Sequence, residues 1–303
     1  MLGAWLTALE MVNNRVLVLC ATGKAGRNVC RALVEAGFDV YGTTRSASGS
    51  LAALGATPVL ANYTQRPDLD RAFAESQAKM VFVITDYFGA AGRSIDREVL
   101  QGKHAIDAAK AAGVDHLIFM SVADAERFDA KTHHIKAKVI LENYVRQSGL
   151  RHTILRPGAF FENLDDAANW NPLKKGWVSF LTEKSCKFCS TFDIGRAAAI
   201  AFHNPDDWAG KSLDVVAWQG DLAAIAAALQ TVSGVPVRHR LAIPIVLRRL
   251  LLNDLHHMCL YFETGGLSAD PEDFKKIVPD AQSAEDWFRF HNRYSNGEPI
   301  VTA

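Results

Sequence analysis

The stretch that most constrains the fold is residues 15–45, where a strand, a glycine-containing loop, a helix and a second strand follow one another. Residues 15–20 are apolar and partly β-branched, which is typical of a strand buried on both faces. Apolar side chains recur at helical spacing over residues 27–36, and Gly37 stands where a left-handed helix end is expected. Residues 40–44 complete a βαβ unit, the repeating unit of a parallel sheet.

The loop between the first strand and the helix has residue types that can hold a pyrophosphate. A helix N-terminus presents free backbone N–H groups and the positive end of the helix dipole. Gly23 and Gly26 let the chain turn sharply and approach phosphates closely. Cys20 and Val29 replace the first and third glycines of the usual spacing, so a purely structural turn is the alternative. The loop residues predicted to bind a dinucleotide are Ala21, Thr22, Gly23, Lys24, Ala25 and Gly26.

The end of the second strand indicates which dinucleotide would bind. Sites for NAD usually have an acidic residue here that binds the ribose hydroxyls. This chain has Arg45, preceded by two threonines and followed by a serine. A guanidinium with adjacent hydroxyls suits the extra 2′-phosphate of NADP(H). We therefore predict NADP(H) as the cofactor, with an ordinary exposed arginine as the alternative.

Composition excludes several classes of function. The 303 residues carry 33 Lys+Arg and 33 Asp+Glu, a balance that argues against direct nucleic-acid binding. No apolar run reaches transmembrane length, so no membrane association is expected. Residues 1–14 read as a short extension without signal- or transit-peptide features. Five scattered cysteines are typical of a reducing compartment. We expect a cytoplasmic protein, with nuclear access left open.

One cysteine pair has the spacing of a metal-binding motif. Cys186 and Cys189 are three residues apart, and His256, His257 and Cys259 could complete a zinc site. The first pair, however, lies in a segment that reads as a strand, where residues three apart point to opposite faces. We therefore predict free thiols and no metal.

Strands and helices alternate through the first half of the chain, which predicts an α/β fold with a doubly wound parallel Rossmann sheet. We expect an NADP-binding domain over residues 1–157, with a returning segment at about 187–217, and a smaller, mostly helical lobe over 158–303. Ligands of such sheets bind beyond the carboxyl ends of the strands. Candidates for the site at these ends include Thr85, Phe88 and Ser121.

Helix signals also mark the second half of the chain. Asp193 is expected to cap an alanine-rich helix, and Gly234 to end another. Residues 245–261 read as one leucine-rich amphipathic helix that would line a pocket or a partner surface. A capping-box variant formed by Ser283 and Asp286 opens the last helix. Three aromatic residues of that helix are expected to pack inward: Trp287, Phe288 and Phe290.

Lys138 is the main catalytic candidate. The helix predicted from residue 133 places His134 and Lys138 on one face. Short-chain dehydrogenases have Tyr-x-x-x-Lys there, where the phenol protonates a carbonyl and the lysine lowers the pKa of the phenol and holds the ribose. A histidine can donate a proton near neutral pH, and Ser121 can orient a substrate. The alternative is that Lys138 only anchors the cofactor or the helix surface.

With these residues placed, the chain resembles the NmrA-like family of atypical short-chain dehydrogenases, and more distantly the isoflavone-reductase-like group. The resemblance extends from Arg15 to about Phe290 and rests on several short motifs taken together. These motifs are residues 19–27, Thr44-Arg45, Gln101-Gly102-Lys103, His134 to Lys138, Leu155-Arg156-Pro157-Gly158, Phe161-Glu162-Asn163 and Asp193-Ile194-Gly195-Arg196-Ala197-Ala198.

The resemblance implies an NADP(H)-binding Rossmann domain and a smaller lobe with a cleft between them. Lys138 matches the lysine that both groups keep, and Arg45 matches the arginine that meets the 2′-phosphate. Asn62 stands where many members have an aspartate near the adenine, and Cys20 stands where they have glycine. Both departures bear on affinity for the cofactor, because a Cβ at the turn restricts the backbone. Substrate contacts are expected from Phe88, Phe160, Phe161 and Asn163.

The family divides in function, and this sequence is compatible with more than one branch. One hypothesis is an NADPH-dependent reductase of a small carbonyl or quinone-type compound. The other is a non-catalytic NADP(H) sensor that acts through a regulatory protein partner. A third is a structural subunit that has lost the cofactor. Absence of Tyr-x-x-x-Lys fits the first two equally, and either would be a monomer or a homodimer.

Overall fold

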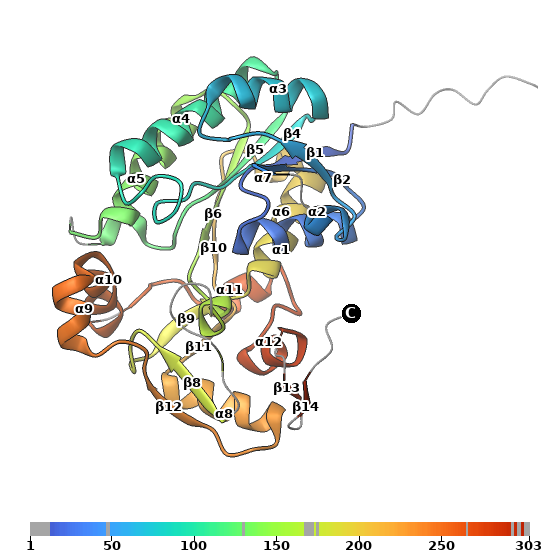
Figure 1. Cartoon of the computed structure of the whole chain (residues 1–303). Helices are drawn as coiled ribbons and strands as arrows, with labels where there is room; N and C mark the ends of the chain where they lie inside the picture. The colour runs from blue at the N-terminus through green and yellow to red at the C-terminus, as the bar shows by residue number, and fades with distance from the viewer. Residues whose placement is uncertain are drawn as a thin grey trace, which may run out of the picture.

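The computed structural model describes residues 13–46, 49–128, 131–166, 173, 176–264, 266–291, 294–295 and 298–299. Residues 1–12, most of the predicted N-terminal extension, lie outside this described part. Within this described part, the chain forms one large sheet and several small elements, which lie beyond one end of the strands of that sheet (Figure 1).

The large sheet has seven strands, all parallel, and it confirms the predicted Rossmann fold. The order of strands reverses between β1 and β4, which makes their carboxyl ends the expected place for a ligand. Across the sheet the strands are β10 (Ser212–Val215), β6 (His152–Pro157), β5 (His116–Met120), β4 (Met80–Val83), β1 (Arg15–Val18), β2 (Asp39–Thr44) and β3 (Thr57–Leu60).

Helices cover both faces of the sheet, so alternate residues of the central strand enter different cores. Val16 and Val18 belong to the core beneath α1 (Lys24–Glu35) and α6 (Thr191–His203). Leu17 belongs to the opposite core. That second core is covered by α3 (Arg66–Ser76), α4 (Ile95–Ala111) and α5 (His133–Gln147), while the short α2 (Gly49–Ala52) and α7 (Pro205–Trp208) lie at the edges.

Among the described residues, the smaller lobe combines helices with three small sheets. One joins β11 (Trp218–Gly220), β9 (Cys186–Cys189) and β7 (Ala159–Phe160), the second joins β12 (Arg238–Leu241) to β8 (Trp177–Phe180), and the third joins β13 (Tyr294–Ser295) to β14 (Glu298–Pro299). The remaining elements are η1 (Ala125–Arg127), η2 (Phe161–Leu164), α8 (Leu222–Ser233), α9 (Ile245–Leu251), α10 (Asn253–Glu263), α11 (Pro271–Lys275) and α12 (Ala284–His291).

Several local predictions are confirmed. Gly37 and Gly234 follow α1 and α8 in left-handed conformations, with φ of 88° and 68°. Ser283 and Asp286 exchange backbone-to-side-chain hydrogen bonds at the start of α12, as a capping box requires. The two thiols of Cys186 and Cys189 diverge, because the first lies in the core of the smaller lobe and the second in the core beneath α1.

Three local predictions are wrong. Ser190, and not Asp193, caps α6, since the Ser190 hydroxyl accepts the N–H of Asp193 at 3.0 Å. The helix predicted over residues 245–261 is two helices, because Leu252 leaves helical geometry with φ −132° and ψ 52°. Phe290 is 49% exposed, whereas the two aromatic residues before it in α12 are buried: Trp287 and Phe288.

Gly26 gives a direct test of how tightly α1 packs on the glycine loop. A Cβ at this position would lie 2.2 Å from the Cys20 carbonyl oxygen and 2.8 Å from Ala21 Cα, both backbone atoms. We expect Gly26→Ala to lower the free energy of unfolding by about 3 kcal/mol, measured in urea. Gly49→Ala is the matched control, because its Cβ would meet nothing within 4 Å. Equal stability of the two variants would contradict this packing.

Candidate functional site

The glycine loop leaves the N-terminus of α1 without a side-chain cap. Gly23 is the N-cap residue, and its N–H donates to the Cys20 carbonyl at 3.0 Å. The first turn of α1 contains no acidic residue. The positive end of the helix therefore has no negative side chain of its own, and it lies where the strand order reverses. These residues fit a bound pyrophosphate.

Cys20 takes over the conformation of the glycine it replaces. Its φ is 56°, in the left-handed region that glycine adopts without penalty. Its N–H donates to the Thr43 hydroxyl at 3.0 Å, which ties the loop to β2. Burial raises the pKa of the Cys20 thiol, and the nearby Asp86 carboxylate raises it further. The loop thus keeps the turn that the motif needs, with a protonated thiol in place of a hydrogen atom.

The predicted ribose and adenine contacts lie at the ends of β2 and β3. Arg45 is exposed and takes part in none of the ion pairs formed by the described residues. The Thr44 hydroxyl donates to the Ser46 carbonyl at 2.8 Å, so it is already engaged. Asn62 forms a turn with Thr64, whose hydroxyl donates to the Asn62 side-chain oxygen at 2.8 Å. Among the described residues at the ends of β2 and β3, Arg45 is therefore a cation without an ion-pair partner.

Lys24 connects the glycine loop to the smaller lobe. Its ammonium group lies 2.7 Å from the Asp166 carboxylate and 2.9 Å from the Asn163 side-chain oxygen. The next turn of α1 contacts α6, since the Asn28 amide donates to the Thr191 hydroxyl at 2.6 Å. Asn163, predicted to contact substrate, thus holds Lys24 in this structure. The charge of Lys24 is balanced by Asp166, and no local sequence pattern marks Asp166 as its partner.

Lys138 reaches the carboxyl end of β4 and forms a buried ion pair there. Its ammonium group lies 2.9 Å from Glu98 Oε1, and it donates to Thr85 Oγ1 at 2.5 Å and to the Thr85 carbonyl at 3.2 Å. The Thr85 hydroxyl in turn donates to Glu98 at 2.7 Å. The Lys138 side chain is 12% exposed and that of Glu98 is fully buried. The predicted residues Thr85 and Lys138 therefore meet, and Glu98 joins them.

His134 lies one turn before Lys138 and pairs with a residue of the smaller lobe. Its Nδ1 is 2.6 Å from Asp254 Oδ2, and the other oxygen of Asp254 accepts the N–H of His133. The rings of Phe88 and Tyr87 lie 5.3 and 6.1 Å from the imidazole. Phe88 is 47% exposed, as a wall open to a ligand would be. Asp254 was invisible as a partner because it follows His134 by 120 residues.

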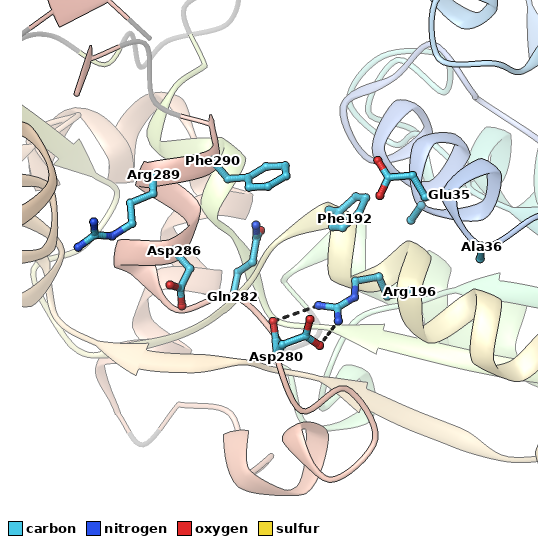
Figure 2. A pocket seen from close by; sticks show the side chains of 10 residues that line it. Glu35, Ala36, Phe192, Arg196, Asp280, Gln282, Asp286, Arg289 and Phe290 are labelled. Carbon is cyan, nitrogen blue, oxygen red and sulfur yellow. Dashed lines mark hydrogen bonds and ion pairs between the residues drawn. The ribbon is translucent and has the colours of Figure 1, made fainter. Parts of the chain in front are cut away.

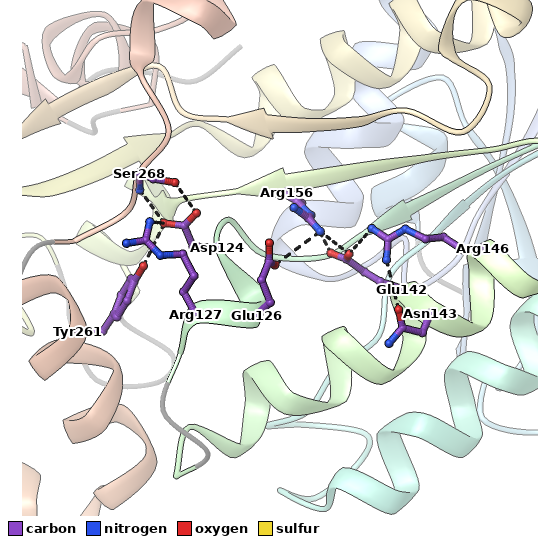
Figure 3. Close-up of polar contacts among 9 residues, drawn as sticks. All are labelled: Asp124, Glu126, Arg127, Glu142, Asn143, Arg146, Arg156, Tyr261 and Ser268. Atoms are coloured by element: carbon purple, nitrogen blue, oxygen red, sulfur yellow. Dashed lines mark hydrogen bonds and ion pairs between the residues drawn. The ribbon is translucent and has the colours of Figure 1, made fainter.

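Ser121 ends β5 beside a buried carboxylate. The Ser121 side chain is buried, and Glu142 of α5 lies next to it with its pKa lowered. Burial alone would raise the pKa of Glu142, but hydrogen bonds from Arg156 and Arg146 outweigh it. Arg156 binds both oxygens of Glu142, at 2.9 and 2.6 Å (Figure 3). The surroundings of Ser121 are therefore an ion-pair network that fixes α5 against β6.

Asp124, just beyond Ser121, joins the sheet to the smaller lobe. Its carboxylate accepts hydrogen bonds from the Tyr261 hydroxyl at 3.0 Å and from the N–H and hydroxyl of Ser268, each at 2.6 Å (Figure 3). Burial would raise the pKa of Asp124, but these bonds and Arg127 lower it overall. Asp124 was not among the predicted site residues, although its place after a strand end was the available signal.

The two remaining aromatic candidates lie in different surroundings. Phe161 is fully buried and stacks on Phe188, with ring centroids 5.2 Å apart, in the core of the smaller lobe. It packs that lobe and does not form the predicted wall of a substrate site. Phe160 is half-buried and packs against the core beneath α1. Of the three predicted walls, Phe88 alone is exposed beside the catalytic candidates.

A hollow of about 630 Å³ lies elsewhere, between α1, α6 and α12 (Figure 2). It is lined by aromatic side chains and by charged ones, among them the Arg196–Asp280 pair. None of the predicted site residues lines it. No cluster of metal-binding side chains occurs among the described residues, and none of the described helices has the length and apolarity needed to cross a membrane.

Comparison with known proteins places the chain in a family context. The sequence profile of the NmrA-like family matches residues 12–287. A (4-alkanoyl-5-oxo-2,5-dihydrofuran-3-yl)methyl phosphate reductase of Streptomyces griseus is 31% identical over 157 residues, which are 52% of this chain and 51% of the relative. The chain spans about half the length of the curated relatives it matches.

Two solved structures share the fold over most of this chain. The NADPH-dependent quinone oxidoreductase QOR2 of Escherichia coli, complexed with NADPH, superimposes with a TM-score of 0.70 at 22% identity, covering 89% of this chain and 97% of that one. The negative transcriptional regulator NmrA, in complex with NADP, superimposes with a TM-score of 0.70 at 20% identity, covering 91% and 94%. At these identities the similarity shows the fold.

The buried pair of Lys138 and Glu98 gives a prediction for stability. Lys138→Met leaves the Glu98 carboxylate buried without its cation, so we expect the free energy of unfolding at pH 7 to fall by about 3 kcal/mol. The double variant Lys138→Met with Glu98→Gln should recover most of that loss, because the stranded charge is gone. Urea denaturation of both variants and of Glu98→Gln alone measures the coupling. Additive effects would contradict a direct ion pair.

Proposed function

The chain belongs to the NmrA-like family, and from that premise we propose that it binds NADP(H) and reduces a small carbonyl or quinone-type compound. The observation that carries the proposal is the uncapped N-terminus of α1. Arg45, at the end of the neighbouring strand β2, has no ion-pair partner among the described residues. A pyrophosphate suits the first group, and a 2′-phosphate suits the second. Bound NADPH would supply a hydride to the substrate.

The residues around the end of β4 support a role in positioning both reactants. Lys138 is fixed by Glu98 and Thr85, so its ammonium group is held at the strand end where a nicotinamide ribose is expected. His134 lies one turn away and can hold a proton for a reduced oxygen. The exposed ring of Phe88 offers an apolar surface to the substrate. The reductase and quinone oxidoreductase among the compared proteins are consistent with this class of reaction.

A second function, an NADP(H) sensor acting through a protein partner, is favoured by the surface of α9. Five apolar residues of this short helix are between 46% and 72% exposed: Ile245, Val246, Leu247, Leu250 and Leu251. Exposed apolar groups of this size mark interaction surfaces. The fold shared with a negative transcriptional regulator is compatible with such a role.

Turnover separates the two functions. We expect the purified protein to oxidise NADPH, followed by the absorbance of the reduced nicotinamide, in the presence of some members of a quinone and enone panel. Tight binding of NADPH without turnover across the panel, together with partner binding that differs between NADPH and NADP⁺, would favour the sensor instead. If neither dinucleotide raised the melting temperature of the protein, both proposals would be contradicted.

Arg45 should set the preference between the two dinucleotides. We expect Arg45→Ala to weaken NADPH binding by about tenfold to a hundredfold, the usual contribution of charge-assisted hydrogen bonds. NADH lacks the 2′-phosphate, so its affinity should change little. Isothermal calorimetry with both nucleotides measures the difference. Arg66→Ala, which removes an exposed arginine paired with Asp70, is the control. An equal loss for NADPH and NADH would contradict the role assigned to Arg45.

A further inference from the structure

The contact between α5 and α10 joins two groups that are remote in the sequence, and it lies beside the exposed Phe88. His134 and Asp254 are largely buried, with 15% and 19% of their side chains exposed. They face each other through the Nδ1 edge of the imidazole and one carboxylate oxygen. The pair therefore combines a group that can carry a proton with an anion that can fix its orientation.

Asp254 is held in its charged form by two helix ends. It lies in the first turn of α10, where a negative side chain is stabilised by the helix dipole. It also accepts the N–H of His133 at the start of α5, whose own N-cap, Thr132, makes no side-chain cap. Burial alone would raise the pKa of Asp254, but the hydrogen bonds from His134 and His133 lower it overall. Asp254 is thus an anion at neutral pH.

An anionic Asp254 determines where His134 carries its protons. A carboxylate without a proton can only accept, so Nδ1 of His134 must be the donor in their hydrogen bond. The second nitrogen, Nε2, is then the one that can give or take a proton. This nitrogen is on the other edge of a ring whose neighbours are the aromatic side chains of the loop after β4.

We propose that Asp254 is a positioning residue for His134, and that Nε2 of His134 delivers the proton to the substrate oxygen. This inference rests on the reductase function proposed above. With NADPH bound, the cofactor would supply a hydride to the substrate carbon and be left as NADP⁺. As the C=O π bond breaks, the substrate oxygen would take the Nε2 proton of His134. His134 is left neutral with its proton on Nδ1, and it regains the second proton from water.

Among the described residues, three other titratable groups lie near His134 in space or along α5. Tyr87 lies across the ring, with centroids 6.1 Å apart, and burial raises its pKa, so it stays neutral near pH 7. His133 precedes His134 in α5, and Lys138 follows one turn later with its charge balanced by Glu98. Asp254 is thus the anion in direct contact with the ring. Removing its charge should make the imidazolium less favourable and move its titration to lower pH.

Nuclear magnetic resonance of ¹⁵N-labelled histidine tests the proton arrangement without any substrate. We expect the neutral ring of His134, assigned by comparison with His134→Gln, to carry its proton on Nδ1. In Asp254→Asn we expect loss of this tautomer preference and a titration midpoint at lower pH. Asp221→Asn is the matched control, because Asp221 also caps a helix but does not contact His134. Unchanged tautomer and midpoint in Asp254→Asn would overturn the inference.

Activity profiles test the catalytic part. With the best substrate of the panel, we expect kcat/KM to fall at high pH as His134 loses its proton, and this fall to begin at lower pH in Asp254→Asn. At pH 8 the variant should have a kcat lower by about tenfold to a hundredfold. In His134→Gln the fall of kcat/KM at high pH should disappear. This variant keeps the inference testable if Asp254→Asn does not fold.

The outcomes distinguish this inference from the proposed function. An active protein whose profile is the same in wild type and Asp254→Asn would overturn the inference alone. A wild-type protein that binds NADPH but reduces nothing would overturn the proposed reductase, and with it the proton delivery, whatever the resonance data show.

Discussion

The site depends on a helix N-terminus that the chain leaves without a negative partner. Among the described residues, no side chain caps the start of α1, and no acidic residue stands in its first turn. The loop before it is turned so tightly that Gly26 approaches the Cys20 carbonyl more closely than any Cβ allows. Because the loop leaves β1 where the strand order reverses, this uncompensated positive end lies at the natural ligand position of the sheet.

Around this positive end, three basic side chains lie against an acidic partner. Asp166 neutralises Lys24, Glu98 neutralises Lys138, and Asp254 pairs with His134. Two of these three pairs also connect the Rossmann sheet to the smaller lobe, as Asp124 does through Tyr261 and Ser268. Arg45 is the exception at the edge of the sheet. A ligand that carries several phosphates would meet the N-terminus of α1 and Arg45, which has no ion-pair partner among the described residues.

Local patterns were enough to predict the sheet and the ends of α1 and α8 at Gly37 and Gly234. The apolar run after Arg15 predicted a strand buried on both faces. The structure confirms this, since alternate side chains of β1 enter different cores. The four-residue spacing of His134 and Lys138 placed both on one face of α5, because residues four apart lie one above the other on a helix. What the sequence could not reveal was which distant residue meets each candidate. Glu98 and Asp254 approach only through tertiary packing, and no local period encodes that.

The errors have physical causes of the same kind. Phe161 was predicted as a pocket wall from its place after a strand, but stacking on Phe188 draws it into the core of the smaller lobe. Asp193 has the residue type of an N-cap, yet its carboxylate accepts the N–H of Gln282 instead, and Ser190 caps the helix. The break at Leu252 gives no compositional signal, and it is this break that places Asp254 in the first turn of α10.

The central claim is that the uncapped N-terminus of α1 holds a pyrophosphate. Backbone amide resonances followed during titration with NADPH test it most directly. The account predicts that the largest shifts occur at the amides of Gly23, Lys24 and Ala25, accompanied by smaller shifts near Arg45. Shifts confined to other regions, such as the hollow beside α12, or no shifts at all, would contradict it.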